Sequence, residues 1–287
     1  MIVAVTSKRG GTGGTSLSLV MSYLLNKEFN RKVCLVDLRD NNDIKKLLQL
    51  NTQACVDNLL SEFGINNRFT TIEENIVEHN GVSVIPGVTT LITNYLLKKS
   101  TKIKELLIEL NSRFDVVIVD VLDDELLEIL VEIGVDILPI NVLDQNRLVV
   151  EEYQKDMRVG FVKGIMVINR VDNRVWPQES MFKKHFSNNT LFVLPFSDRL
   201  KSTMNKDGLN LVEIGKTEFY TAFLSVCECV NSKIEEYNKG KYKVEDELTL
   251  DSLLESRPPV VRKQPKQVKK GFFASLFGLG GKGGVKR

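Results

Sequence analysis

The sequence predicts a doubly wound α/β domain on a mostly parallel sheet, followed by a C-terminal amphipathic tail. Short β-branched runs alternate with helix-like stretches, which is the pattern of such a sheet. Charge also divides sharply along the chain: from residue 256 to the end there are nine Lys or Arg and no Asp or Glu, leaving 30 basic against 37 acidic residues in 1–255, a net charge of −7. An acidic body with a strongly basic tail indicates an anionic partner for the tail.

The strands are expected where both faces of a run are apolar, as in buried parallel strands. These runs are residues 2–6, 33–37, 82–86, 115–121, 135–140, 164–169 and 191–195. Helical patterns occupy 16–29, 100–113 and 218–237. We therefore expect the α/β domain over 1–237, a charged, proline-containing linker over 238–268 and the tail over 269–287.

Composition sets the class of protein. The chain has 287 residues, 43% of them hydrophobic, which is enough for a full core. Its four cysteines are scattered, without the spacing of a zinc site or the density of a secreted scaffold, so we expect reduced thiols in the cytoplasm. A basic leader before an apolar region is missing at the start, and no apolar run reaches 18 residues, so neither export nor membrane spanning is indicated.

A glycine-rich loop follows the first expected strand. Gly10, Gly11, Gly13 and Gly14 allow a tight turn that aims backbone N–H groups at an anion, and the next helix adds its positive end. A hydroxyl from Thr15 or Ser16 at the start of that helix is placed to ligate Mg²⁺. The lysine that such loops usually carry is absent. A loop of this kind alone is also compatible with a mere tight connection.

Two aspartates strengthen the case for a ligand site. Asp37 ends the second expected strand and Asp120 ends another, where the carboxyl ends of parallel strands form a ligand crevice. Two carboxylates there are suited to holding Mg²⁺ or its waters. Each taken alone is equally suited to capping a loop or helix.

With this loop and these two aspartates, the chain resembles the ParA/MinD group of P-loop ATPases, a SIMIBI-type family with a deviant Walker A motif. The family loop, approximately K-G-G-x-G-K-[ST], falls on "RGGTGGT", and "FDVVIVDV" looks like Walker B. The resemblance covers most of 1–235 and is closest to the CpaE/TadZ-like branch, whose loops often lack the second lysine. It implies that ATP or ADP is held through its phosphates by Arg9, Gly10, Gly11, Thr12, Gly13, Gly14, Thr15 and Ser16, with Mg²⁺ on Thr15, Asp37 and Asp120.

The departures from the family pattern put hydrolysis in question. Gly14 replaces the lysine that would neutralise charge on the β and γ phosphates during transfer. Asp37 and Asp120 are the candidate catalytic residues, but the acidic residue often found two positions after Asp37 is Arg39 here. Because the backbone cradle is retained and the transition-state contacts are lost, the sequence predicts that nucleotide is still bound although hydrolysis is weak or lost.

The segment "NRVD" at 169–172 bears on the base. It resembles the Asn-x-x-Asp pattern that reads guanine in other P-loop proteins, whereas in the ParA/MinD family an Asn-Arg at this strand end accompanies adenine. The resemblance implies that Asn169, Arg170, Pro195 and Phe196 lie near adenine, and GTP stays the less favoured alternative. Trp176 either covers a base or, the interpretation we favour, fills a gap beneath its loop.

Arg9 replaces the family's signature lysine, which reaches across a homodimer to the partner's nucleotide. A guanidinium there is suited to a bidentate phosphate contact, and a solvated surface arginine is the alternative.

The tail has an amphipathic pattern. An apolar stripe at helical spacing follows two lysines, so the segment suits a membrane interface with anionic headgroups; the residues are Lys269, Lys270, Phe272, Phe273, Leu276, Phe277 and Leu279. A similar stretch in MinD-like proteins implies membrane targeting. A partner-protein groove or nucleic acid remains the alternative.

Together these features predict a cytoplasmic protein, peripherally associated with the inner face of the cell membrane, that binds nucleotide, dimerises, hydrolyses ATP weakly or not at all, and places a partner complex such as a pilus or secretion machine. An active ATPase switch for DNA segregation or division-site positioning is the alternative.

Overall fold

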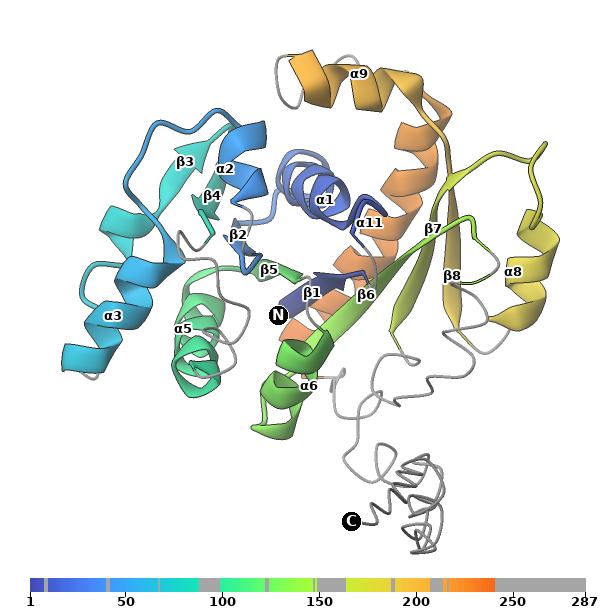
Figure 1. The fold of residues 1–287 in the computed structure, drawn as a ribbon. Coiled ribbons are helices and arrows are strands. Elements are labelled where there is room, and N and C mark those ends of the chain that lie inside the picture. The colour runs from blue at the N-terminus through green and yellow to red at the C-terminus, as the bar shows by residue number, and fades with distance from the viewer. Residues whose placement is uncertain are drawn as a thin grey trace, which may run out of the picture. The chain divides into compact units, whose positions relative to one another are not determined.

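In the computed structural model, eight strands form one sheet in the order β3-β4-β2-β5-β1-β6-β7-β8 (Figure 1). The structure describes residues 1–7, 10–39, 42–66, 68–87, 99–121, 124–146, 148, 164–186, 189–206, 214, 215 and 217–240. All strand pairs are parallel except β3 with β4. The strands are β1 Ile2–Thr6, β2 Val33–Asp37, β3 Val77–His79, β4 Val82–Ile85, β5 Val116–Val121, β6 Ile137–Asp144, β7 Ile165–Val171 and β8 Thr190–Pro195.

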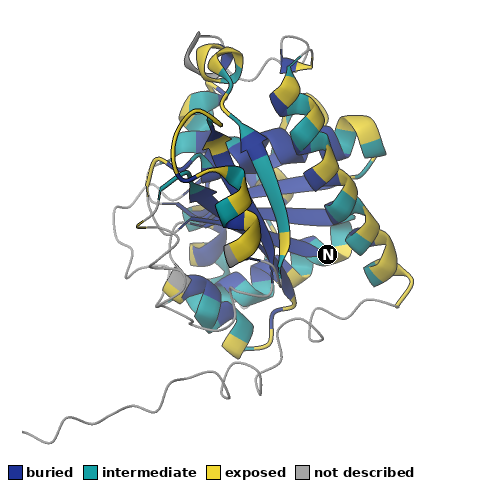
Figure 2. Ribbon diagram, turned by 90° about the vertical axis from the view of Figure 1, so that its right-hand side faces the viewer, coloured by how far each residue is buried: buried dark blue, intermediate teal, exposed yellow. Residues whose placement is uncertain are grey.

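Helices cover both faces of the sheet, because the central strands are apolar on both sides. Strand residues of one parity, such as Val3 and Val5, pack with α1 and α11, whereas their neighbours Ile2 and Ala4 pack with α3, α5 and α6 (Figure 1). Figure 2 shows the sheet as a buried layer inside this double cover. The helices are α1 Gly14–Phe29, α2 Asp43–Leu47, α3 Val56–Asn66, α5 Ser100–Arg113, α6 Asp124–Glu132, α8 Glu179–His185, α9 Asp198–Lys206 and α11 Glu218–Asn238, with a short 3-10 turn η1 at Glu73–Asn75.

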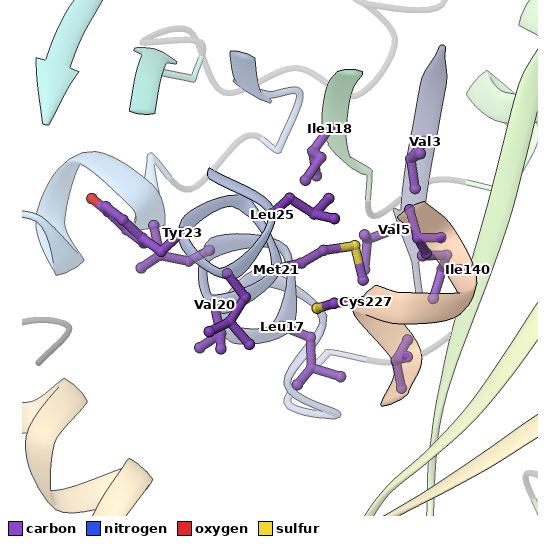
Figure 3. Close-up of a cluster of buried hydrophobic side chains, with 14 of the residues drawn as sticks. Val3, Val5, Leu17, Val20, Met21, Tyr23, Leu25, Ile118, Ile140 and Cys227 are labelled. Atoms are coloured by element: carbon purple, nitrogen blue, oxygen red, sulfur yellow. The ribbon is translucent and has the colours of Figure 1, made fainter. Parts of the chain in front are cut away.

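Helix α1, which follows the glycine-rich loop, is buried from Gly14 to Leu25 except at Ser16. Leu17, Met21 and Leu25 lie against strand residues and against Cys227 of α11, as Figure 3 shows. Burial of a large apolar side chain contributes about 1.5–3 kcal/mol. The start of α1, and with it the glycine-rich loop, is therefore anchored firmly to β1 and α11.

The sequence-based fold is confirmed. All seven expected strands form, and the three expected helices appear as α1, α5 and α11. The sequence did not indicate β3, a three-residue antiparallel edge strand whose residues are only partly buried. Helix α11 runs one residue into the expected linker and ends at Asn238, whereas residues 241–268 of that linker and the whole expected tail lie outside the described residues.

Candidate functional site: a phosphate loop with a buried arginine

The glycine-rich loop joins β1 to α1 at the carboxyl edge of the sheet. Gly13 precedes the first residue of α1 with φ 96°, and Gly11 has φ 82°, so both adopt left-handed backbone that favours glycine. A Cβ atom on Gly13 would also lie 2.5 Å from Nδ2 of Asn169, whereas one on Gly10 would meet nothing within 4 Å. The loop is thus closely packed on its β7 side and open around Gly10.

The backbone amides of this loop are available to a ligand. Among the described residues, the amides of residues 10–16 donate no hydrogen bond to the backbone of another described residue, while the carbonyl of Gly13 accepts from the N–H of Leu17 at 2.9 Å. Thr12 is 4% exposed, and its Oγ1 is buried without a partner. Because buried polar groups are normally paired, these amides and this hydroxyl indicate a site for an anion.

Strand β7 holds the loop from one side. Nδ2 of Asn169 donates to the carbonyl of Thr12 at 2.8 Å, and its Oδ1 accepts from the N–H of Arg170 at 3.0 Å. The guanidinium of Arg170 donates to the carbonyl of Gly11 and lies 3.3 Å from Oδ1 of Asp144 at the end of β6. Two loop carbonyls are therefore fixed toward β7.

Strands β2 and β5 bring two carboxylates to the other side. Asp37 and Asp120 are partners in the register of these strands, and both are fully buried. Oδ1 of Asp120 accepts from Oγ of Ser18 in α1 at 3.2 Å, and the hydroxyl of Thr15 lowers the pKa of this carboxyl. Asp37 accepts from the N–H of Arg39 at 2.9 Å, and a Cβ on Gly87 would lie 2.8 Å from its Oδ2. Asp120 faces α1, whereas Asp37 is enclosed by its own loop and Gly87.

Burial dominates the electrostatics of the carboxylate pair. Desolvation and the charge of Asp120 raise the pKa of Asp37 to about 8, against the hydrogen bonds from the amides of Arg39 and Ile44. Desolvation also raises the pKa of Asp120, and the Arg39 guanidinium is the largest opposing influence. The pair therefore needs a nearby positive charge in order to ionise.

Arg39 supplies that charge. Its side chain is 6% exposed, and Nε lies 3.0 Å from Oδ1 of Asp120. Nη2 donates to Oγ of Ser7 at 3.2 Å and to the carbonyl of Val121 at 3.5 Å. A Cβ atom on Gly14 would lie 2.8 Å from Nη2. An arginine from β2 thus fills the space beside the position where the family pattern has lysine.

The predicted Mg²⁺ ligands are partly brought together. Thr15 lies close enough to Asp120 for its hydroxyl to lower the pKa of that carboxyl, and Oδ2 of Asp120 is buried without a hydrogen-bond partner, which suits a cation or its water. Asp37 is the register partner of Asp120, and its Oδ2 is likewise buried without a hydrogen-bond partner. Among the residues that the structure describes, no group of three or more His, Cys, Asp or Glu side chains forms a metal cluster.

The predicted base-binding residues lie at the carboxyl ends of β7 and β8. Pro195 ends β8, and Phe196 follows it with 46% of its surface exposed and its N–H bonded to the carbonyl of Val171 at 3.1 Å. Trp176 is 55% exposed, so our expectation that it fills a gap beneath its loop is wrong. That loop is held instead by Gln145, whose Nε2 donates to three of its carbonyls, those of Asp172, Val175 and Pro177.

Sequence reasoning treated Arg39 only as a lost acidic residue and did not identify Ser18 at all. Ser18 lies one helical turn after Gly14, and a serine inside an apolar helix was the available signal. The predicted phosphate ligand Arg9 lies outside the described residues, as do all the predicted membrane residues in 269–287.

A family model described as an AAA domain matches residues 1–134. Solved structures match more of the chain. The chain has the fold of the ParA/MinD superfamily. A putative plasmid partition protein from Borrelia burgdorferi bound to AMPPNP matches with TM-score 0.65 and 17% identity, covering 81% of this chain and 98% of that one.

Two MinD structures of this fold give the same result. The septum site-determining protein MinD from Pyrococcus horikoshii, complexed with Mg-ADP, matches with TM-score 0.61 and 18% identity over 80% of this chain and 96% of that chain. The MinC:MinD complex from Aquifex aeolicus matches with TM-score 0.61 and 15% identity over the same shares, 80% and 96%. No curated protein sequence matches the chain significantly. The fold that the resemblance implies is confirmed, and the CpaE/TadZ-like branch stays a prediction.

Proposed function

We propose that this chain is a membrane-associated positioning or scaffold protein that binds an adenine nucleotide at the loop of residues 10–16 and hydrolyses it weakly or not at all. The observation that supports this most is the combination of an open phosphate cradle with Arg39 beside Gly14 in place of a loop lysine. The cradle supports binding, and the missing lysine argues against efficient phosphoryl transfer.

Binding would use the loop amides and the positive end of α1 for the phosphates. The solved relatives hold AMPPNP or Mg-ADP, which supports ATP or ADP with Mg²⁺ as the ligand class. Thr15 and Asp120 are the residues that would hold the metal, directly or through water. A bound Mg²⁺ supplies charge neutralisation between neighbouring phosphates. Asn169 and Arg170 keep the loop in its binding conformation through the carbonyls of Thr12 and Gly11.

Hydrolysis should be slow because the loop has no lysine to neutralise the negative charge that develops on the transferred phosphate. Loss of one such donor costs about 10²–10³ in kcat. We expect phosphate release from ATP and Mg²⁺ by the native chain to equal that of Asp120→Asn, which serves as an inactive control. Robust turnover that Asp120→Asn abolishes would remove the scaffold proposal in favour of an active enzyme.

Adenine is the better supported base. An Asn-x-x-Asp site reads guanine through its aspartate, but Asp172 here already pairs with its neighbour Arg174, whose Nε and Nη2 lie 2.9 and 2.7 Å from its two carboxylate oxygens. Both polar side-chain atoms of Asn169 are likewise engaged by the protein. Competition against a fluorescent ADP analogue should give tighter displacement by ADP than by GDP, and the reverse order would favour a guanine switch.

Membrane attachment is assigned to the tail of 269–287. In the described part of the chain, no helix combines the length and apolarity that crossing a membrane requires. Full-length protein should co-sediment with anionic vesicles, and a chain ending at residue 268 should not. Phe273→Asp in the full chain is the matched point variant, expected to weaken sedimentation while retaining every basic residue. Equal sedimentation of all three proteins would defeat the membrane proposal.

The cargo is proposed by resemblance to the CpaE/TadZ-like branch, as a pilus or secretion complex placed by a dimer of this chain. A second candidate is an active switch for DNA segregation or division-site positioning, which the plasmid partition and septum site-determining relatives favour. The MinC:MinD complex shows a related protein assembled with a partner protein. Retention of duplex DNA by residues 1–240, dependent on ATP, would favour this second candidate.

A further inference from the structure

Arg39 lies inside the phosphate site, beside the start of α1. Its guanidinium is nearly fully buried between the loop, α1 and the end of β5. It meets Asp120 as an ion pair at 3.0 Å, yet the Nε–H is not aligned for a hydrogen bond and has no hydrogen-bond partner. A buried arginine with an unused donor next to an anion cradle points to a ligand that completes its bonding.

Gly14 and Arg39 are sterically complementary. A Cβ at position 14 would lie 2.8 Å from Nη2 of Arg39 and 3.3 Å from Oγ of Ser7. Any side chain at position 14 would therefore force the guanidinium out of its place. The two positions have exchanged roles: the family pattern carries its cation on the loop, at position 14, whereas here Arg39 after β2 supplies it.

Asp120 is also affected by this exchange. One of its carboxylate oxygens, Oδ1, is shared between Ser18 and the guanidinium of Arg39. A carboxylate already neutralised by an arginine attracts a divalent cation less strongly than a free one. The site therefore contains a permanent positive charge at the place where related sites rely on lysine and Mg²⁺ together.

We propose that Arg39 is the resident cation of the phosphate site, contacting the nucleotide phosphates so that a nucleoside di- or triphosphate is bound without Mg²⁺. The proposal rests on the nucleotide-binding function proposed above. A guanidinium suits this task because it stays charged and offers paired donors to phosphate oxygens. Mg²⁺ still accompanies the nucleotide when present, but adds little to the affinity.

The test is the dissociation constant of a fluorescent ADP analogue for the full chain, with 5 mM Mg²⁺ or with EDTA, at about 0.1 M salt. The native protein should show Kd values within about threefold of each other. Arg39→Met should bind about 10- to 100-fold more weakly in EDTA, the range for a lost charged hydrogen bond. Mg²⁺ should then restore much of the affinity, because Asp120 has lost its arginine.

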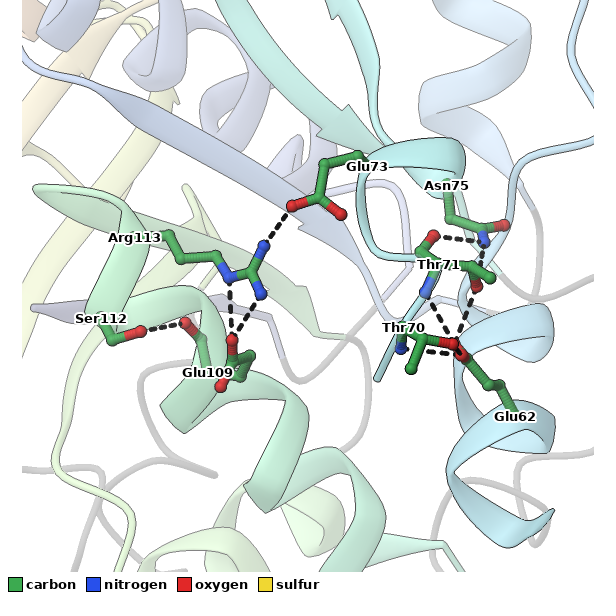
Figure 4. Close-up of polar contacts among 8 residues, drawn as sticks. All are labelled: Glu62, Thr70, Thr71, Glu73, Asn75, Glu109, Ser112 and Arg113. Atoms are coloured by element: carbon green, nitrogen blue, oxygen red, sulfur yellow. Dashed lines mark hydrogen bonds and ion pairs between the residues drawn. The ribbon is translucent and has the colours of Figure 1, made fainter. Parts of the chain in front are cut away.

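A double variant tests the reciprocity of the two positions. Gly14→Lys alone introduces a second cation into occupied space and should weaken binding in EDTA. Gly14→Lys combined with Arg39→Asp restores the family arrangement and should bind well only with Mg²⁺. Arg113→Met is the control: this arginine also joins ion pairs, with Glu109 and Glu73, but at the end of α5 that precedes β5, on the amino edge of the sheet (Figure 4). Its affinity should equal that of the native chain.

The outcomes separate the two proposals. No binding by the native chain with or without Mg²⁺ would end the proposed function and this inference together. Native binding that requires Mg²⁺ by more than tenfold would overturn the inference and leave the function intact. Folded Arg39→Met that binds in EDTA like the native chain would show that Arg39 only neutralises buried carboxylates. If Arg39→Met does not fold, the Mg²⁺ dependence of the native chain and the binding of the double variant still test the proposed role of Arg39.

Discussion

Gly13→Ala offers the sharpest test of the loop geometry. Left-handed backbone at φ 96° costs an alanine about 1–2 kcal/mol. Its Cβ would also lie 2.5 Å from Nδ2 of Asn169, whose amide must then leave the carbonyl of Thr12. A lost hydrogen bond with a buried donor left unpaired costs about 1–3 kcal/mol more. The free energy of unfolding should therefore fall by about 2–5 kcal/mol.

Urea denaturation followed by circular dichroism measures this change, and Gly134→Ala is the matched control. Gly134 has φ 83°, but a Cβ there meets only Nζ of Lys104 at 3.9 Å, so this variant bears the backbone cost alone, about 1–2 kcal/mol. It lies between α6 and β6, at the amino edge of the sheet, and should bind nucleotide like the native chain. Equal destabilisation of the two variants would refute the close packing of the loop against β7.

Three further predictions follow from individual contacts. Asn169→Ala should weaken nucleotide binding about tenfold, because a buried bond to the loop is lost, whereas Arg170→Ala should cost less, since its ion pair with Asp144 is 40% exposed on both sides; equal affinities in calorimetry would contradict this order. Asp120→Asn should leave Arg39 without its counter-ion and lower the melting temperature in calorimetric scans, and an unchanged melting temperature would speak against the ion pair. His79, whose pKa is lowered by burial beside Tyr23, stabilises the fold as the neutral ring, so its contribution is present above pH 6.5 and is lost as the pH falls through the lower folded value. Urea titrations at pH 5 and 7 should show this loss, at most about 1.4 kcal/mol per pH unit, and His79→Gln should show less of it.

The architecture was predictable because apolar runs at both faces require a doubly covered sheet. The run at 2–6 is buried throughout, and the paired runs at 33–37 and 116–121 carry the two aspartates to one edge. Strand β3 was not predictable, since Val77–His79 is short and only half-buried, and it forms through pairing with β4 rather than through its own pattern. Such an edge strand forms because the chain runs beside β4, and the local hydrophobic pattern does not indicate this.

The site was predictable as a set of residues and not as a set of contacts. The glycines, Asp120 and Asn169 stand at strand ends, so sequence alone brings them to one edge. The contact between Arg39 and Gly14 joins positions on two different strand ends, and it depends on how a long side chain folds back over β5. The exposure of Trp176 was missed for a similar reason, because Gln145, the residue after β6, holds that loop through hydrogen bonds that the loop's own sequence does not indicate.

Hydrogen exchange of the backbone amides in residues 10–16, with and without ADP, tests the central claim most directly. The account predicts strong protection of these amides on nucleotide addition, because they bond the phosphates and donate to no other backbone group in the described chain. Protection of Gly13→Ala should be much weaker. Nucleotide binding that leaves these amides exchanging as fast as in the free protein would contradict the account.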